Sequence, residues 1–187
     1  RFAALRASKD PQAKFLWAIF RDVFHYAAVQ LESIADNARD VDLAMRWGFG
    51  WAQGPFEIWQ SAGWADIARA IAADIAAGET MSDTPLPAWV LEDREGVHTP
   101  QGSWSPRRKA YVPRSALPVY QRQLYPDRVF GEAPDDRGET LWENAGVRLW
   151  RRADQDARIG IVSIISKMHA VGEEVMDGLL EAIARAE

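Results

Sequence analysis

Hydrophobic side chains recur every three or four residues through the first eighty positions, which is the spacing of amphipathic helices. The longest run begins at Asp10, a suitable N-cap, and has Pro11 at the first helical position. Its apolar stripe consists of Leu16, Phe20, Val23, Ala27, Leu31 and Ile34. Four more apolar residues widen the stripe: Phe15, Ile19, Phe24 and Tyr26. The pattern predicts one long helix that is covered by protein on two sides.

A short helix is predicted next, capped by Asp36 or Asn37 and ended by Gly48. Its inward residues would be Val41, Ala44 and Met45. Asp42 and Arg46 are four residues apart on the predicted outer face, where such a pair contributes about 0.3 kcal/mol. The carboxylates of this segment, "DNARDVD", are therefore interpreted as caps and solvated groups rather than as a metal site.

Two further helices are expected before residue 80. One runs from Pro55 to Gly63, and the other from Trp64 to Gly78 with isoleucines at four-residue steps. The stretch from Arg46 to Trp64 combines four tryptophans with several glycines. Glycine allows close approach of the backbone and aromatic rings supply large buried surfaces, so tight helix packing is the simplest explanation. The alternative is an apolar wall for a long hydrophobic ligand, facing the amides at the start of the Pro55 helix.

The character of the chain changes after residue 80. Residues 81–137 hold eight of the ten prolines, and "GVHTPQGSWSPRRKAYVP" within them predicts a hairpin that turns near Gln101 and Gly102. Residues 138–187 predict a strand pair around Ala145–Gly146, a strand "IGIVSIIS" with apolar residues on both faces, and a final helix. One side of that helix would present Val171, Val175, Leu179 and Ile183. A unit this small rarely has a core of its own, so either this helix docks on the first unit or on a partner, or the chain is a piece of a longer protein. We expect the last.

Composition narrows the possible functions. The chain has 187 residues, no cysteine and a formal net charge of −5. Zinc–thiolate sites, disulfides and cysteine nucleophiles are excluded, and the charge argues against nucleic acid as a partner. No apolar run is long enough for membrane insertion and no signal peptide is apparent, so a cytoplasmic location is expected.

Few residues suggest catalytic chemistry. His25, His98 and His169 have no helical metal-site spacing, and they are interpreted as satisfied or surface histidines. A serine–histidine–acid triad stays open on spacing alone. The single compact basic run, Arg107, Arg108 and Lys109, is either a solvated face or a contact for an anionic ligand tail.

The stretch "ARDVDLAMRWGFGWAQGPFEIWQSAGW" resembles the C-terminal helical domain of 3-hydroxyacyl-CoA dehydrogenases. The residues that match the family pattern are Asp40, Asp42, Ala44, Met45, Gly48, Gly50, Gly54, Pro55, Phe56 and Glu57. The resemblance covers roughly residues 10–80. The family's NAD-binding loop and catalytic histidine–glutamate pair do not occur in this chain, and Ala52 and Gln53 depart from the family's usual residues before "GPF".

Residues 139–187 resemble the start of an enoyl-CoA hydratase (crotonase) domain, with Lys167 to Ala170 in the place of a short family segment. Together the two resemblances suggest a multifunctional fatty-acid oxidation protein. The implied fold is mainly α: a four-helix domain in residues 1–80, a proline-rich hairpin and linker in 81–137, and an incomplete crotonase-like β-β-β-α piece in 138–187.

The resemblance implies a fatty-acid β-oxidation enzyme that uses NAD, with this segment structural and inactive alone. It implies acyl-CoA contacts at Phe49, Gln53, Gly54, Pro55 and Phe56, and CoA phosphate contacts at Arg107, Arg108 and Lys109. The implied partners are acyl-CoA, the missing NAD-binding and crotonase domains, and a second copy in a homodimer; no metal is implied. A non-catalytic interaction module that pairs through its aromatic surface and a free-standing carrier of apolar ligands are the alternatives.

Overall fold

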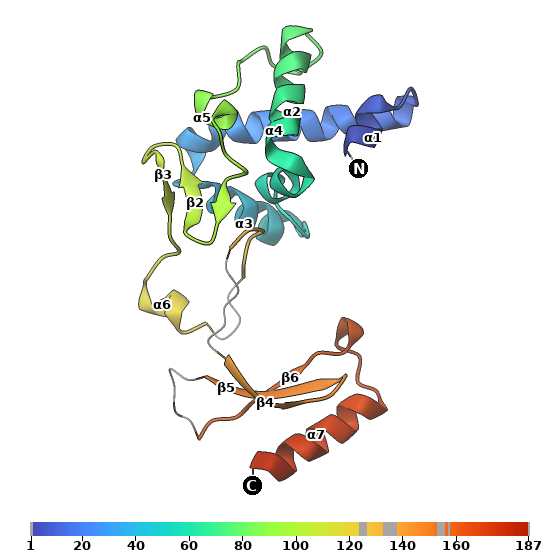
Figure 1. Cartoon of the computed structure of the whole chain (residues 1–187), viewed down its shortest axis with the longest axis vertical. Helices are drawn as coiled ribbons and strands as arrows, with labels where there is room; N and C mark the ends of the chain where they lie inside the picture. The colour runs from blue at the N-terminus through green and yellow to red at the C-terminus, as the bar shows by residue number, and fades with distance from the viewer. Residues whose placement is uncertain (1, 124–126, 133–137, 153–155, 157, 187) are drawn as a thin grey trace. The chain divides into compact units, whose positions relative to one another are not determined.

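The computed structural model describes residues 2–123, 127–132, 138–152, 156 and 158–186. They belong to two compact units, Arg1–Ala133 and Pro134–Glu187 (Figure 1). The first unit is mainly helical and carries one small antiparallel sheet. The second unit consists of another small antiparallel sheet and a helix.

The long predicted helix is confirmed as α2, Pro11–Ile34, preceded by the short α1, Phe2–Ala7. The Asp10 side chain caps α2, because its Oδ1 accepts a hydrogen bond of 2.7 Å from the amide of Gln12. Pro11 takes the first helical position, where its missing N–H leaves no hydrogen bond unmade.

The expectation that protein covers α2 on two sides is wrong. The buried side of α2 consists of Trp17, Arg21, Phe24, His25, Ala27, Ala28 and Leu31. The other side leaves Phe15, Leu16, Ile19, Tyr26 and Ile34 exposed. Apolar residues surround most of this helix, so the pattern alone could not select which side packs inward.

The helix α3, Ala38–Phe49, is capped by Asn37, whose Oδ1 accepts from the amide of Arg39 at 3.0 Å. It continues past Gly48 and ends where Gly50 adopts the left-handed conformation (φ +70°). The next helix, α4, spans Pro55–Ala76 and joins the two predicted helices across a kink at Gly63 (φ +102°). Only glycine takes such a φ without strain, which explains why the break occurs there.

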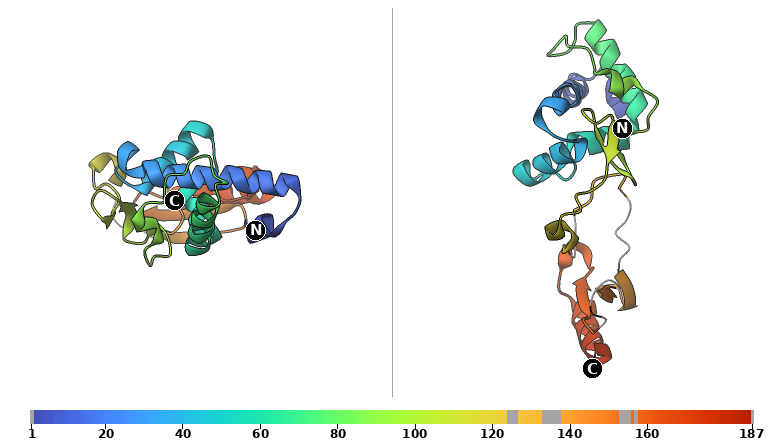
Figure 2. Two further views of the ribbon diagram at one scale, coloured as in Figure 1. Left: turned by 90° about the horizontal axis from the view of Figure 1, so that it is seen from above. Right: turned by 90° about the vertical axis from the view of Figure 1, so that its left-hand side faces the viewer.

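The core of the first unit lies where α4 crosses α2 (Figures 1 and 2). Ring stacking continues from Phe24 to Trp59 (centroids 5.5 Å apart) and from Trp59 to Trp64 (4.1 Å). It then continues to Trp89 of the short α5, Ala88–Leu91, at 6.1 Å. Both buried indole N–H groups are satisfied, since Trp59 donates to the carbonyl of Trp64 and Trp64 to that of Val90. This aromatic stack explains the tryptophan-rich sequence as core packing.

The proline-rich region begins with a three-stranded antiparallel sheet. Its strands are β1, His98–Thr99, β2, Gly102–Ser105, and β3, Ala110–Val112, in that order across the sheet. The predicted turn near Gln101 and Gly102 is confirmed between β1 and β2. A single helical turn, α6, Pro118–Gln121, follows. The sheet packs on α3 through β2 and therefore belongs to the helical unit.

The second unit has the predicted β-β-β-α order. The strands β4, Gly138–Glu143, β5, Val147–Arg152, and β6, Ile161–Ile164, form one antiparallel sheet with β5 at the centre. A single 3₁₀ turn, η1, Lys167–His169, precedes the helix α7, Glu173–Ala186. The prediction that the last strand is buried on both faces is wrong, because β6 is an edge strand with Val162 exposed.

One side of α7 is packed and the other is open. Val175, Gly178 and Ala182 are buried, and Gly178 lies directly over Val147 of β5. Of the four residues predicted to share a buried side, Val175 is buried, Leu179 is half-buried, and Val171 and Ile183 are exposed. The small residues Gly178 and Ala182, rather than the large ones alone, therefore form the contact with the sheet.

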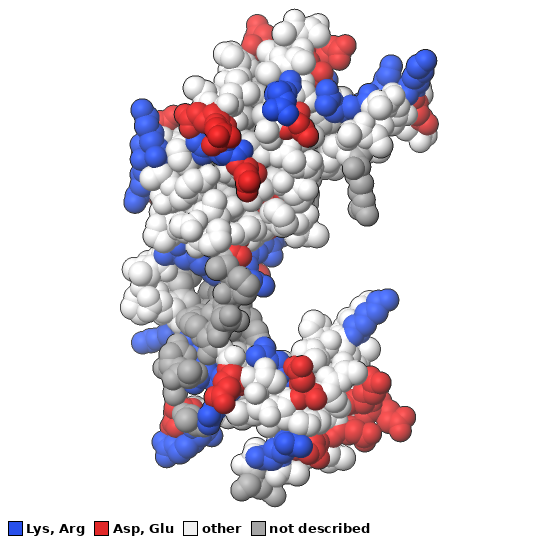
Figure 3. Space-filling view, viewed as in Figure 1, with Lys and Arg blue, Asp and Glu red and all other residues white. Residues whose placement is uncertain are grey.

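Acidic and basic side chains are interspersed on the face drawn in Figure 3. No helix within the described residues is both long and apolar enough to cross a membrane.

The contact between α7 and the sheet leads to a prediction. A Cβ added at Gly178 would lie 2.8 Å from Cβ of Val147, closer than packed atoms allow. Gly178→Ala should therefore lower the free energy of unfolding by about 1–2 kcal/mol, although alanine normally stabilises a helix interior. Urea titration measures the change. Gly172→Ala, just before α7, is the control because its added Cβ meets nothing within 4 Å, and equal stabilities of the two variants would contradict this packing.

Candidate functional site

The start of α4 is capped by a side chain from another helix. Gly54, at the N-cap position, has no side chain to offer, and Pro55 has no N–H to satisfy. Asp42 of α3 accepts the next two amides instead, from Phe56 at 2.9 Å and from Glu57 at 3.2 Å. The amide of Gly54 donates to Oε2 of Glu57 at 2.8 Å. Every N–H in the first turn of α4 therefore has an acceptor.

Glycine is required at position 54 because the two helices meet there. A Cβ at Gly54 would lie 2.3 Å from Cα of Asp42. Any side chain would therefore displace Asp42 from the amides that it caps. Close approach of backbones, one of the two explanations offered for the glycines of this stretch, is correct at this position.

Asp42 also connects α3 to the sheet β1–β2–β3 through a hydrogen bond. Its Oδ2 accepts from Nε2 of His98 at 2.6 Å, and Nδ1 of His98 lies 2.8 Å from Oγ of Ser103 on β2. When the imidazole is neutral, Nε2 carries the proton and Nδ1 accepts from the serine hydroxyl. The prediction that places Asp42 on the outer face of α3, paired with Arg46, is therefore wrong. Asp42 is fully buried, and Arg46 lies beside Glu57 and Asp127.

Two residues of α4 extend the network. Gln60 accepts from the amides of Val97 and His98 at 2.8 and 2.9 Å and donates to the carbonyl of His98 at 2.8 Å. Glu57 accepts from the amide of Phe130 at 2.8 Å. We refer to Asp42, Glu57, Gln60, His98 and Ser103 as the polar junction. It fastens the sheet and residues 129–131 to the helices.

Burial dominates the electrostatics of the polar junction. Removal from water disfavours the charged carboxylate and raises the pKa of Asp42, and the negative charge of Glu57 acts in the same direction. The hydrogen bond and charge of His98 and the amide of Phe56 oppose that rise. The charged form of Asp42 is therefore stabilised by hydrogen-bond donors of the protein. This is usual for a buried structural carboxylate, whereas a surface carboxylate is solvated by water.

The three types of residue of a catalytic triad meet here, but they are sealed. Asp42, His98 and Ser103 have at most 2 % of their surface exposed. A substrate carbonyl could not reach the serine oxygen without opening the sheet away from α3. The interpretation of His98 as a satisfied structural histidine is confirmed. His25 is satisfied as well, with Nε2 2.7 Å from the carbonyl oxygen of Thr84.

The predicted acyl contacts do not form one surface. Gly54 and Phe56 are buried in the packing between helices, whereas Phe49 is 74 % exposed and Gln53 is also exposed. Of the five residues, Pro55 lines a hollow on the outside of the helices. We name this hollow of about 960 Å³ the apolar groove. Its principal walls are Phe15, Ile19, Val23, Tyr26, Ile34, Val41, Met45, Trp51, Pro55 and Met81.

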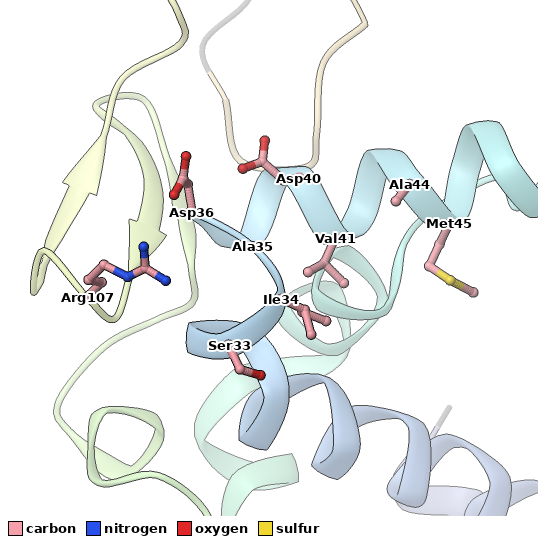
Figure 4. A pocket seen from close by; sticks show the side chains of 9 residues that line it. All are labelled: Ser33, Ile34, Ala35, Asp36, Asp40, Val41, Ala44, Met45 and Arg107. Carbon is pink, nitrogen blue, oxygen red and sulfur yellow. The ribbon is translucent and has the colours of Figure 1, made fainter.

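The predicted phosphate contacts are likewise separated. Arg107 extends from the turn between β2 and β3 toward Asp36 and lines a pocket of about 550 Å³ (Figure 4). Its Nη2 donates to the carbonyl of Glu32 at 3.0 Å. Arg108 lines a different pocket, of about 610 Å³, and Lys109 lines neither. The pocket of Arg107 also contains two carboxylates, which do not favour a phosphate group.

The described residues offer no group of side chains suited to a metal ion. They do not fit NAD either, because both sheets are antiparallel and no described strand leads through a glycine-rich loop into a helix. Sequence reasoning did not single out Gln60, Ser103 or Trp51. Gln60 carries no local signal because its partners Val97 and His98 lie 37 and 38 positions away. Ser103 joins the network only through His98, whose carboxylate partner lies 56 positions away. Trp51 lines the apolar groove together with residues of α2 that lie far from it in the chain.

Comparison with known proteins gives one significant relative. Over 92 residues, 49 % of this chain, the sequence is 34 % identical to a Bacillus subtilis (strain 168) protein described as a probable 3-hydroxyacyl-CoA dehydrogenase. The match spans only 11 % of that protein's length. No protein-family model and no solved structure matches the chain, and the comparisons give no support to the crotonase resemblance.

The contact between Gly54 and Asp42 predicts a large effect of a small substitution. Gly54→Ala should lower the free energy of unfolding by about 2–3 kcal/mol, because the new methyl group collides with backbone. Gly48→Ala, where a Cβ meets nothing within 4 Å, should instead raise stability by about 0.5–1 kcal/mol. Chemical denaturation of both variants is the measurement, and a neutral Gly54→Ala would rule out the tertiary cap.

The raised pKa of Asp42 predicts the pH dependence of stability. The folded protein binds this proton more tightly than the unfolded chain does, so the free energy of unfolding should fall as pH rises from about 4 through the folded pKa. Asp42→Asn removes this contribution and should flatten the decline, whatever its effect on absolute stability. The exposed Asp66→Asn serves as the control that keeps the decline. Denaturation between about pH 4 and pH 7 compares them, and parallel curves for wild type and Asp42→Asn would contradict the assignment.

Proposed function

We propose that this chain is a structural segment of a cytoplasmic, NAD-dependent 3-hydroxyacyl-CoA dehydrogenase of fatty-acid β-oxidation. The observation that carries the proposal is the 34 % identity over 92 residues to the Bacillus protein. The dehydrogenase motif around Gly54 and Pro55 supports it, because these residues form a specific junction in the structure rather than a generic helix start. The NAD-binding domain of the parent enzyme is the partner that would supply the cofactor.

The proposed role of the segment is to hold the other domains of the enzyme in place. The segment itself takes no part in the oxidation reaction. The triad-like residues of the polar junction are sealed, and the described residues do not fit NAD. The α3–α4 turn would contribute an apolar wall to the acyl-CoA site through Trp51 and Pro55, which line the apolar groove. Residues 138–186 would begin an enoyl-CoA hydratase domain of the crotonase type, a proposal supported by the β-β-β-α order of the second unit.

A non-catalytic interaction module is the second candidate. The observation that favours it is the apolar side of α2, which the described residues of the first unit leave exposed. The two candidates differ in their ligands. An acyl-CoA enzyme segment should respond to the acyl chain, whereas an interaction module should not.

Two assays test the proposed function. The chain should not oxidise NADH with acetoacetyl-CoA above background, because it lacks residues for the reaction. It should bind dodecanoyl-CoA more tightly than free CoA in calorimetric titration, since the apolar wall contacts only the acyl part. Trp51→Ala should weaken dodecanoyl-CoA binding roughly tenfold, while Trp47→Ala, an exposed tryptophan outside the groove, should not.

Each outcome has a clear consequence. Turnover by the isolated chain would disprove the structural role. Equal affinity for free CoA and dodecanoyl-CoA, or no binding of either, would remove the support for the acyl wall and favour the interaction module.

A further inference from the structure

A buried cation lies against the outer end of the aromatic stack. The guanidinium carbon of Arg94 is 3.8 Å from the ring centroid of Trp104 and 5.8 Å from that of Trp89. The two indole rings, with centroids 6.3 Å apart and planes tilted by 37°, form a corner that we name the indole corner. The side chain of Arg94 is 7 % exposed, although it comes from the loop between α5 and β1. The loop therefore directs a charged group inward onto aromatic faces, which is a cation–π contact.

Arg94 leaves hydrogen bonds unmade in the indole corner. Its Nη2 donates to Oε2 of Glu92, but its Nε and Nη1 are buried without a hydrogen-bond partner among the described residues. Nε1 of Trp104 is buried and lacks a partner in the same way. Buried N–H groups nearly always have an acceptor, and leaving one without an acceptor is costly. The indole corner thus attracts a positive charge but does not suit a cation that must donate hydrogen bonds.

A trimethylammonium group matches the indole corner better than a guanidinium does. It carries the positive charge that aromatic faces attract, and it has no N–H to leave unpaired. A hydroxyl or carboxylate on a short arm of the same ligand would accept from Nε1 of Trp104. The loop adds attraction for a cation, because Glu92, Asp93 and Glu95 are all exposed on it.

The loop that carries Arg94 has few attachments to the rest of the first unit. The backbone of residues 93–95 makes no hydrogen bond with other described residues. Attachment resumes at Gly96 and Val97, whose carbonyl and amide are hydrogen-bonded by side chains of the first unit. Glu92 is exposed and two residues from Arg94, so their ion pair can persist outside the corner. Arg94 can therefore leave the indole corner without disruption of the sheet.

We propose that the indole corner binds a small soluble trimethylammonium compound that carries a hydroxyl or a carboxylate, and that Arg94 fills the site until such a ligand displaces it. The acidic loop favours a free cation over a lipid headgroup, whose phosphate would be repelled by the same carboxylates. The proposal goes beyond the proposed function and does not depend on it, because the ligand contains neither CoA nor an acyl chain.

Titration of the whole chain with choline chloride at constant ionic strength provides the first test. The NMR resonance of the Trp104 indole N–H, assigned by comparison with Trp104→Phe, should shift with a dissociation constant in the millimolar range. The uncharged tert-butyl analogue of choline, in which carbon replaces the nitrogen, should bind roughly tenfold more weakly, since the aromatic faces attract the charge. Equal binding of the two compounds, or no shift with either, would overturn the proposal.

Removal of the internal occupant provides the second test. Arg94→Ala vacates the indole corner and should bind choline roughly tenfold more tightly than the wild type, because no side chain has to be displaced. Arg108→Ala, a matched change of an exposed arginine outside the corner, should leave the affinity unchanged. Circular dichroism confirms that both variants are folded. An unchanged affinity in Arg94→Ala would show that Arg94 does not compete for the site, and the proposal would fail.

Vesicles of phosphatidylcholine distinguish the two sources of a trimethylammonium group. The chain should remain in the supernatant when the vesicles sediment, because the site is assigned to a free compound. Sedimentation with the vesicles that excess choline reverses would instead assign the indole corner to a lipid headgroup, and would contradict the proposal.

Discussion

The structure of the first unit depends on one buried carboxylate. Asp42 has no contact with water, so its charge must be balanced by donors from the protein. Those donors come from two directions, the amides that begin α4 and the imidazole of His98 on β1. Three local features follow from this single requirement: a glycine at position 54, a proline without an N–H at position 55, and a histidine at position 98 held by Ser103.

This constraint also defines what the unit can do. The polar junction places a serine, a histidine and an acid in line, but it uses all three to hold a sheet on helices. The apolar surface that other molecules can contact lies on the outside of the unit, along α2 and at the α3–α4 turn. A packed helical unit with an apolar outer face agrees with the proposed role of a supporting segment in a larger enzyme, a proposal that rests on the partial similarity to the Bacillus protein.

Local patterns predicted much of this fold. The spacing of apolar residues, Asp10, Asn37 and Pro55 predicted the helices and their starts, because caps and periodicity act within a few residues. The position of Asp42 could not be predicted in the same way. A carboxylate four residues before Arg46 is typical of a surface pair, and the partners that bury it lie 14 and 56 positions away. The exposed side of α2 was missed for a related reason: a helix that is apolar nearly all round gives no sign of which side finds a partner.

Asp42 and His98 act together to join the sheet to the helices, and a double-mutant cycle measures their coupling most directly. The free energies of unfolding of wild type, Asp42→Asn, His98→Gln and the double variant give the coupling between the two side chains. A buried bond of 2.6 Å predicts a coupling of about 1.5–3 kcal/mol. Effects that add to within about 0.5 kcal/mol would show that the two residues stabilise the fold independently, and would contradict this account.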